Sequence, residues 1–186
     1  MMELVWPSIE YLPGYVDALE RGWSPDTVRG EAAAREIQAR ISADAAGYVA
    51  SLVDREAKGD PVKLPDGNIV SRLPGFYQWM WDGEFCGSIN FRWQRGTPAL
   101  PPTCLGHIGY SVVPWKQQRG YATEALRQLL PEAKAEGLPY VEITANTDNL
   151  PSQKVILANG GELVERVPKP PGYPPGEMVR FRITLR

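Results

Sequence analysis

Apolar and polar residues alternate with two different periods along the chain, and the changes of period predict its helices and strands. Alternation with period two over residues 75–82 and 85–93 predicts two strands, and Asp82-Gly83 between them predicts a tight hairpin turn. The other predicted strands are 2–6, 107–113, 140–145 and 179–185. Apolar residues at helical spacing predict helices over 12–21, over 31 to about 58 as one or two helices, over 122–133, and as a short helix after Asn149 that ends at Asn159-Gly160-Gly161.

This order of elements predicts one α+β domain over residues 1–186, with a sheet covered by helices on both faces. The chain is long enough for one substantial core, and neither an internal repeat nor an inter-domain linker divides it. Aromatic residues of the predicted hairpin alternate on each strand, which indicates cross-strand packing in the core. These alternating residues are Tyr77, Trp79 and Trp81 on one strand and Ile89, Phe91 and Trp93 on the other.

Charge and cysteine content narrow the class of protein. The net charge of −2 argues against a nucleic-acid-binding surface. The N-terminus lacks the pattern of a signal peptide, and no run of about 18 apolar residues occurs, so we expect a cytoplasmic protein without a membrane partner. Cys86 and Cys104 lack the spacing of metal ligands and are typical of reduced thiols, so no metal is expected.

The segment Gln117–Ala122 joins the predicted strand 107–113 to the predicted helix 122–133. The first amides of a helix have no intrahelical acceptor and the helix dipole favours negative charge, so this turn is a candidate anion site. Gly120 permits close approach of a ligand to the backbone, and Arg119 adds a positive charge. The alternative is a strand-to-helix turn without a ligand. Neither the nucleotide P-loop pattern nor the dinucleotide glycine fingerprint is present.

The segment follows the pattern Q/R-x-x-G-x-A, and two later features follow it at fixed offsets. The residues concerned are Gln117, Gly120 and Ala122, then Asn149 and Ser152 in N-x-x-[AS], then Gly160 in a turn. Over roughly residues 106–165 the chain resembles the GNAT superfamily of N-acetyltransferases, and it is most similar to a bacterial group of predicted acetyltransferases of unknown acceptor. The resemblance implies a mixed, mostly antiparallel sheet of six to seven strands with helices on both faces.

The resemblance also implies the reaction, a direct transfer of the acetyl group from acetyl-CoA to a primary amine without a covalent intermediate. In that case the loop opened by Gln117 would hold the pyrophosphate with the amides of Gln118, Arg119, Gly120, Tyr121, Ala122 and Thr123. The backbone of Ser111, Val112 and Val113 would pair with the pantetheine arm, and the amide of Val112 or Val113 would stabilise the oxyanion. Asn149 would contact the pantetheine from the opposite side, or cap its helix, or do both.

Four residues are considered for proton transfer. His107, the single histidine, has a side chain whose ordinary pKa suits a general base, although a histidine on a strand is often only packed there. Glu142 is the second candidate for the base, and Tyr110 is a third that fits a core or cofactor-wall position better. Many members of the superfamily carry a tyrosine acid where this chain has Ile156. Ser152 is therefore the expected proton donor for the thiolate, with an ordinary helix serine as the alternative.

The acceptor is expected to be a small-molecule amine or a peptide, and the protein a monomer or a homodimer. By resemblance, the proline-rich segment 168–176 would border the acceptor site, and some of the hairpin aromatics could line it instead of the core. The absence of the tyrosine at Ile156 also supports a second class of function, a non-catalytic acyl-CoA-binding or sensor module on the same fold.

Overall fold

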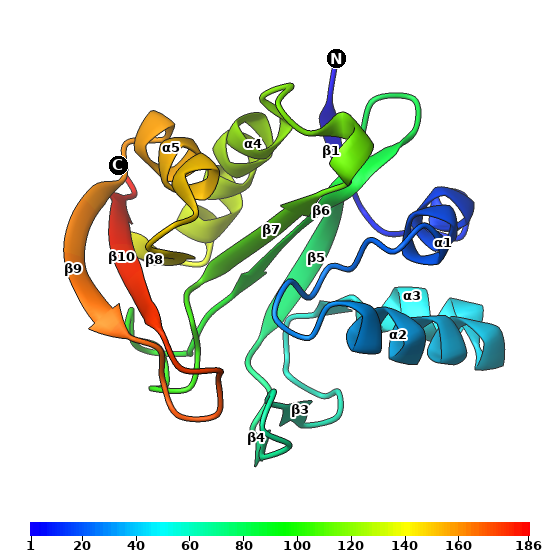
Figure 1. Ribbon diagram of the computed structural model, residues 1–186, viewed down its shortest axis with the longest axis horizontal. Coiled ribbons are helices and arrows are strands. Elements are labelled where there is room, and N and C mark those ends of the chain that lie inside the picture. The colour runs from blue at the N-terminus through cyan, green and yellow to red at the C-terminus, as the bar shows by residue number, and fades with distance from the viewer.

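The computed structural model describes residues 1–186 and contains two main sheets (Figure 1). In the first, neighbouring strands follow the order β1 (Glu3–Val5), β5 (Gly75–Trp81), β6 (Phe85–Arg92) and β7 (Ile108–Val112), and β2 (Val53–Asp54) also pairs with β5. In the second, the order is β8 (Tyr140–Asn146), β10 (Glu177–Thr184) and β9 (Glu162–Pro168). A separate ribbon consists of β3 (Val62–Lys63) and β4 (Ile69–Val70). All pairs are antiparallel.

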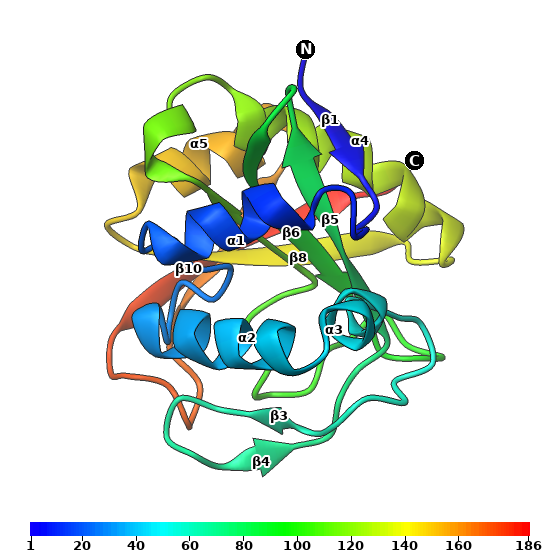
Figure 2. The same ribbon diagram turned by 90° about the vertical axis from the view of Figure 1, so that its right-hand side faces the viewer.

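Helices cover both faces of the first sheet (Figures 1 and 2). One side carries α1 (Leu12–Glu20), α2 (Glu31–Ala43) and α3 (Ala45–Ser51), and the other carries α4 (Tyr121–Ala135) and α5 (Leu150–Ala158). A short helix, η1 (Pro114–Lys116), precedes α4. The predicted α+β class with helices on both faces is therefore confirmed. The helix predicted to reach residue 58 is wrong at its end, because Val53 pairs with Phe76 as part of β2.

Successive side chains of β5 point to opposite faces, and two separate clusters of buried residues result. Phe76 and Met80 pack with Leu126 of α4, whereas Trp79 packs with Tyr15 of α1. The rings of Tyr15 and Trp79 stack with their centroids 4.8 Å apart. The predicted aromatic rows do lie in the core, but the row on β5 faces α1–α3 and the row on β6 faces α4. They are not cross-strand neighbours, because Tyr77 stands opposite Asn90.

The predicted single sheet of six to seven strands is divided between β7 and β8. Each of these strands is hydrogen-bonded on one side only, β7 to β6 and β8 to β10. They meet at one point, where the His107 N–H donates to the Glu142 carbonyl at 2.8 Å and the Glu142 N–H donates to His107 Nδ1 at 2.9 Å. Beyond that point β7 diverges from the second sheet (Figure 1). Both strands therefore leave one edge of backbone unpaired, and we call the space between these edges the slot.

None of the helices has the length and apolar character that a membrane crossing needs. No three His, Cys, Asp or Glu side chains of residues 1–186 are grouped so that they could hold a metal ion.

Candidate active site

The loop before α4 presents six consecutive backbone amides that donate no hydrogen bond within the protein. They belong to Gln118, Arg119, Gly120, Tyr121, Ala122 and Thr123. The first amide of this helix to find an acceptor is that of Glu124, which donates to the Gly120 carbonyl at 3.0 Å. Gln118 and Gly120 have φ angles of 61° and 76°, a left-handed backbone that makes the loop concave. The predicted free amides at a helix start are thus present, in a form suited to an anion.

Asp82, on the turn between β5 and β6, holds both ends of this loop. Lys116 Nζ donates to one carboxylate oxygen at 2.6 Å, and the Tyr121 hydroxyl donates to the other at 2.5 Å. Lys116 also lies 3.0 Å from Glu84. Burial acts to raise the pKa of Asp82, but the hydrogen bonds from Lys116 and Tyr121 outweigh it and hold the pKa well below its usual range. We call Asp82, Lys116 and Tyr121 the clamp.

The clamp was not predicted from the sequence. At Asp82-Gly83 the sequence indicates only a hairpin turn, and the partners of Asp82 lie 34 and 39 residues away. No local pattern marks a contact at that separation.

Of the three residues expected to hold the pantetheine, Val112 alone directs its N–H into the slot. The Val113 N–H donates to the Cys86 carbonyl at 2.9 Å, so the alternative of Val113 as oxyanion donor is wrong. Ser111 is opposite Ser88 in the same hydrogen-bonded register, which directs its backbone toward β6. The Ser111 hydroxyl is occupied as well, because it accepts from Trp23 Nε1 at 2.9 Å. In this register the backbone groups of Tyr110 and Val112 face the slot.

A pair of hydroxyl groups joins β7 to α5. The Tyr110 hydroxyl lies 2.8 Å from Ser152 Oγ and 3.2 Å from the Ser152 carbonyl. Burial raises the pKa of Tyr110 to about 12, so the phenol keeps its proton at neutral pH. Ile156 is fully buried and has no chemistry to offer. The protons closest to this side of the slot therefore belong to Tyr110 and Ser152.

Asn149 is the N-cap of α5, since its Oδ1 accepts from the Ser152 N–H at 3.2 Å. The capping alternative for Asn149 is confirmed. Its side-chain amide donates no hydrogen bond within the protein and is available to a ligand. Gln117 is also used internally, because its Nε2 donates to the Val112 carbonyl at 3.3 Å.

The two predicted base candidates lie together where the sheets meet. His107 is fully buried, and its Nδ1 lone pair accepts from the Glu142 N–H. Burial lowers the pKa of His107 below its ordinary value. The Glu142 carboxylate lies 2.7 Å from Arg182 Nη2 and 3.9 Å from Arg180 Nη1. Glu142 also borders a hollow of about 330 Å³, where segment 99–106 and Pro170 form the opposite wall. This geometry favours Glu142 over His107 for contact with a substrate.

Comparison with known proteins gives the family. Residues 21–162 match the family model described as Acetyltransferase (GNAT) domain. The chain belongs to the GNAT family of acetyltransferases. A search of curated protein sequences found no match to the chain.

Solved GNAT structures share the fold. The acetyltransferase MccE, which confers self-immunity to microcin C7 and was solved with acetyl-CoA and AMP, has a TM-score of 0.63 at 14% identity over 98% of this chain and 92% of that chain. RimL, the ribosomal L7/L12 α-N-protein acetyltransferase in complex with coenzyme A, has a TM-score of 0.61 at 14% identity over 99% and 94%. Mycobacterium smegmatis RimJ in complex with CoA-disulfide has a TM-score of 0.59 at 18% identity over 98% and 81%. Identities this low show the fold alone.

The environment of His107 makes a prediction for this GNAT protein that needs no substrate. The folded state holds His107 neutral, with a lowered pKa, so its contribution to stability is present above the ordinary histidine pKa and is lost as the pH falls below it. We expect His107→Gln to flatten the fall in stability between pH 7 and pH 5, by at most about 1.4 kcal/mol per pH unit. Urea unfolding of both proteins at several pH values measures this, and parallel curves would contradict it.

Proposed function

We propose that this acetyltransferase moves the acetyl group of acetyl-CoA directly to a primary amine of a small molecule or a peptide. The observation that carries the proposal is the junction of two unpaired backbone surfaces, the amides of residues 118–123 and the β7 edge of the slot. The first suits a pyrophosphate and the second suits the amide groups of a pantetheine arm. Solved relatives of the same fold hold acetyl-CoA or CoA. A cytoplasmic location and a monomeric or homodimeric state are part of the proposal.

In this proposal the cofactor enters from the N-terminus of α4. Its pyrophosphate accepts hydrogen bonds from the loop amides, with Arg119 as a further cation and the Thr123 hydroxyl as a further donor. The pantetheine lies along the β7 edge of the slot, in the way an added strand pairs with a sheet edge. The unused amide of Asn149 donates to it from the α5 side. Gln117 contributes by holding the Val112 carbonyl.

The reaction then follows from positions along the slot. The neutral amine attacks the thioester carbonyl, and the Val112 N–H stabilises the negative charge that develops on the carbonyl oxygen. The C–S bond breaks, and the leaving thiolate takes a proton from the Tyr110–Ser152 pair. The proton lost by the amine passes to Glu142 through a chain of water molecules, because Glu142 pairs with His107, about 16 Å from Val112 along the strand. His107 holds the junction of the two sheets in this scheme and takes no proton.

A second candidate, a non-catalytic acyl-CoA-binding or sensor module, is motivated by the buried Ile156 in place of a tyrosine acid. The two proposals differ in turnover. We expect CoA to raise the melting temperature, and acetyl-CoA to release thiol in the presence of at least one member of a panel of amines and peptides. Binding of CoA without turnover of any acceptor would leave the sensor, and absence of CoA binding would contradict both.

One variant tests whether CoA binds at the loop before α4. Gly120 has a φ of 76°, a backbone conformation that costs roughly 1–2 kcal/mol for a non-glycine residue. In Gly120→Val the loop therefore relaxes away from its binding arrangement, and CoA has to restore it. We expect CoA to bind about 10-fold more weakly. Gly137 has a φ of 83° at the other end of α4, and a side chain at either glycine meets open space. Gly137→Val is therefore the matched control, with a similar loss of stability and unchanged CoA affinity in calorimetry.

A further inference from the structure

Arg92, at the end of β6, is a partly buried cation without a carboxylate partner. Its Nε donates to the Gly106 carbonyl at 2.8 Å. No carboxylate oxygen of an Asp or Glu lies within 4.0 Å of the guanidinium nitrogens, the distance that defines an ion pair. The other arginines that are partly buried each face a carboxylate: Arg29, Arg55, Arg72, Arg180 and Arg182. Removing a charge from water is costly unless a partner compensates for it. The Gly106 carbonyl and the Asn90 side-chain oxygen, which accepts from Nη1 at 3.2 Å when the amide is oriented to satisfy both groups, are neutral partners. They leave the charge of Arg92 without an opposite charge, so its guanidinium is a candidate to bind an anion that is not part of the chain.

Arg92 lies beside the slot, at the opposite end of β7 from the cofactor loop. A side chain at Gly109 of β7 would reach within 2.8 Å of Asn90 Oδ1 and 4.0 Å of Arg92 Nη2. The glycine thus lets the Asn90 side chain and the Arg92 guanidinium lie directly over β7. Gly109 and Val112 are roughly 10 Å apart along the strand, at about 3.3 Å per residue.

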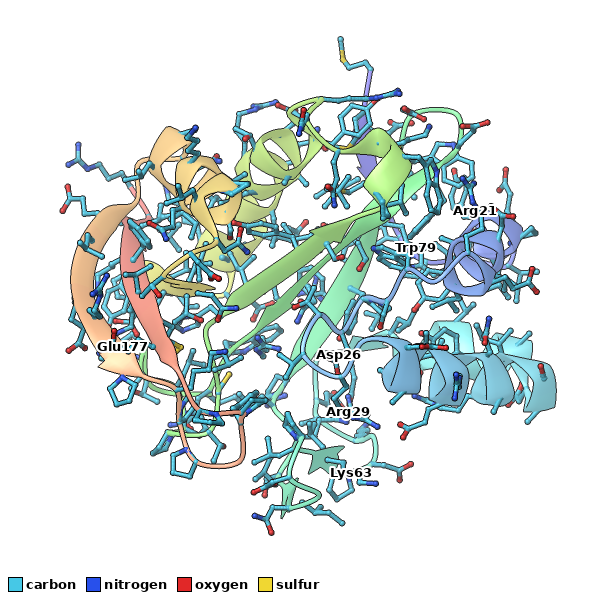
Figure 3. All side chains as sticks on the ribbon, viewed as in Figure 1. Arg21, Asp26, Arg29, Lys63, Trp79 and Glu177 are labelled. Carbon is cyan, nitrogen blue, oxygen red and sulfur yellow. The ribbon has the colours of Figure 1, made fainter.

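Loops from two other parts of the fold reach the same space. Burial raises the pKa of Tyr77 and of Tyr173, and at both phenols the charge of Arg92 opposes this shift whereas the charge of Asp26 adds to it. Tyr173 belongs to the β9–β10 loop and is fixed by donation to the Thr103 carbonyl at 3.1 Å. Asp26 lies on the α1–α2 loop in the middle of the molecule (Figure 3), but its Oδ1 already accepts from two backbone amides.

The ligand chemistry follows from these groups. A guanidinium presents paired N–H donors that match the two oxygens of a carboxylate or phosphate. The anion cannot be the pyrophosphate of the cofactor if that group occupies the loop before α4, because the loop lies beyond the far end of β7. It belongs instead to the molecule that enters the slot from the other end.

We infer that Arg92 binds a carboxylate or phosphate of the acceptor, so that the acceptor is an amine carrying an anionic group several bonds away. This inference rests on the proposed acetyl transfer. With the amine near Val112 and the anion near Gly109, the separation suits an ω-amino acid or a peptide N-terminus with an acidic group beyond the first residue. It does not suit the α-carboxylate of a free α-amino acid.

Matched acceptors test the inference. We expect kcat/KM for 6-aminohexanoate to exceed that for 6-aminohexanamide at least 10-fold, as a charged hydrogen-bonded contact implies. A parallel pair, 6-aminohexyl phosphate and 6-aminohexanol, distinguishes phosphate from carboxylate. Arg92→Gln should abolish the preference for the anion, and Arg92→Lys should keep part of it. The matched control is Arg95→Gln, which changes an exposed arginine three residues away and should keep the full ratio.

Measurements of acceptor binding test this inference independently of the proposed function. Equilibrium affinity for the anionic and neutral compounds, measured with CoA present, needs no turnover and would still report on Arg92 in a protein that transfers nothing. Binding that depends on Arg92 without turnover contradicts only the proposed function. Equal affinities for the two compounds, or a preference that survives in Arg92→Gln, would overturn the inference. Melting curves show whether the variants are folded, and Arg92→Lys serves where Arg92→Gln is not.

Discussion

Replacing Tyr110 with Phe is expected to lower kcat about 100-fold and to leave CoA affinity nearly unchanged. A positioned general acid typically contributes 10²–10⁴-fold, and water in the slot can replace part of that. The Tyr110 hydroxyl and Ser152 Oγ are 2.8 Å apart, and with Ile156 in the usual tyrosine position they are the hydroxyl groups available to the thiolate. Thiol release under saturating acceptor measures kcat, and calorimetry measures the affinity for CoA.

Because the two hydroxyls act as one unit, Ser152→Ala should lower kcat by a similar factor, and the double variant should lose little more than the worse single one. Ser152→Thr keeps a hydroxyl and should recover part of the rate. Tyr48→Phe is the matched control, since it removes another buried phenol, bonded to Tyr15 at 2.7 Å on the α1–α3 side. It should cost about 1 kcal/mol of stability without changing kcat. Unchanged kcat in both Tyr110→Phe and Ser152→Ala would assign the pair a structural role.

The sequence predicts best those structural features that are formed by residues close together in the chain. The loop before α4 was predictable because its glycine, its free amides and the following apolar stripe all lie within one short segment. The end of α3 was not, because the apolar stripe continues through Val53 whether that residue packs on a helix or pairs with Phe76. Asp44, which caps α3 by accepting from the Gly47 N–H, marks a new helix start that the stripe conceals.

Alternation shows which residues of a strand share a face, but it shows neither the neighbour of that face nor the partner of the strand edge. The prediction that the aromatic rows on β5 and β6 lie in the core is therefore confirmed, but the prediction that they pack against each other is wrong. The same limit hid the slot, because nothing in the alternation of β7 and β8 says that their edges remain unpaired. The Tyr110–Ser152 pair, 42 residues apart, and the lack of a carboxylate partner for Arg92 became visible only in three dimensions.

Loss of the clamp should affect stability and cofactor binding together. Asp82→Ala leaves Lys116 largely buried with Glu84 alone as a partner, and breaking such a pair costs about 3 kcal/mol. For a chain of this size that corresponds to a fall in melting temperature of about 6–12 °C. Tyr121, the first residue of α4, also loses the acceptor that fixes its hydroxyl. We expect CoA to bind at least 10-fold more weakly, since the free amides of the loop before α4 would no longer be held in one arrangement.

A matched variant separates the buried contact from charge alone. Glu84→Gln removes the other carboxylate near Lys116, but the side chain of Glu84 is 79% exposed, against 13% for Asp82. We expect Glu84→Gln to change stability by less than about 1 kcal/mol and to leave CoA affinity intact. Equal effects of the two variants would show that the clamp acts only through net charge at the turn.

The pH dependence of the clamp gives the sharpest test. The folded pKa of Asp82 is lowered, so its contribution is present above the ordinary aspartate pKa near 4 and is lost as the pH falls below that value. Burial acts to lower the pKa of Lys116, but Asp82 and Glu84 raise it, so its contribution is present below the ordinary lysine pKa and is lost only as the pH rises through the raised one. The difference in unfolding free energy between the wild type and Asp82→Ala should therefore be constant from about pH 5 to pH 9 and shrink below about pH 4. Urea unfolding over this range measures it, and a difference that grows in acid would contradict the assignment of Asp82 as the charged centre of the clamp.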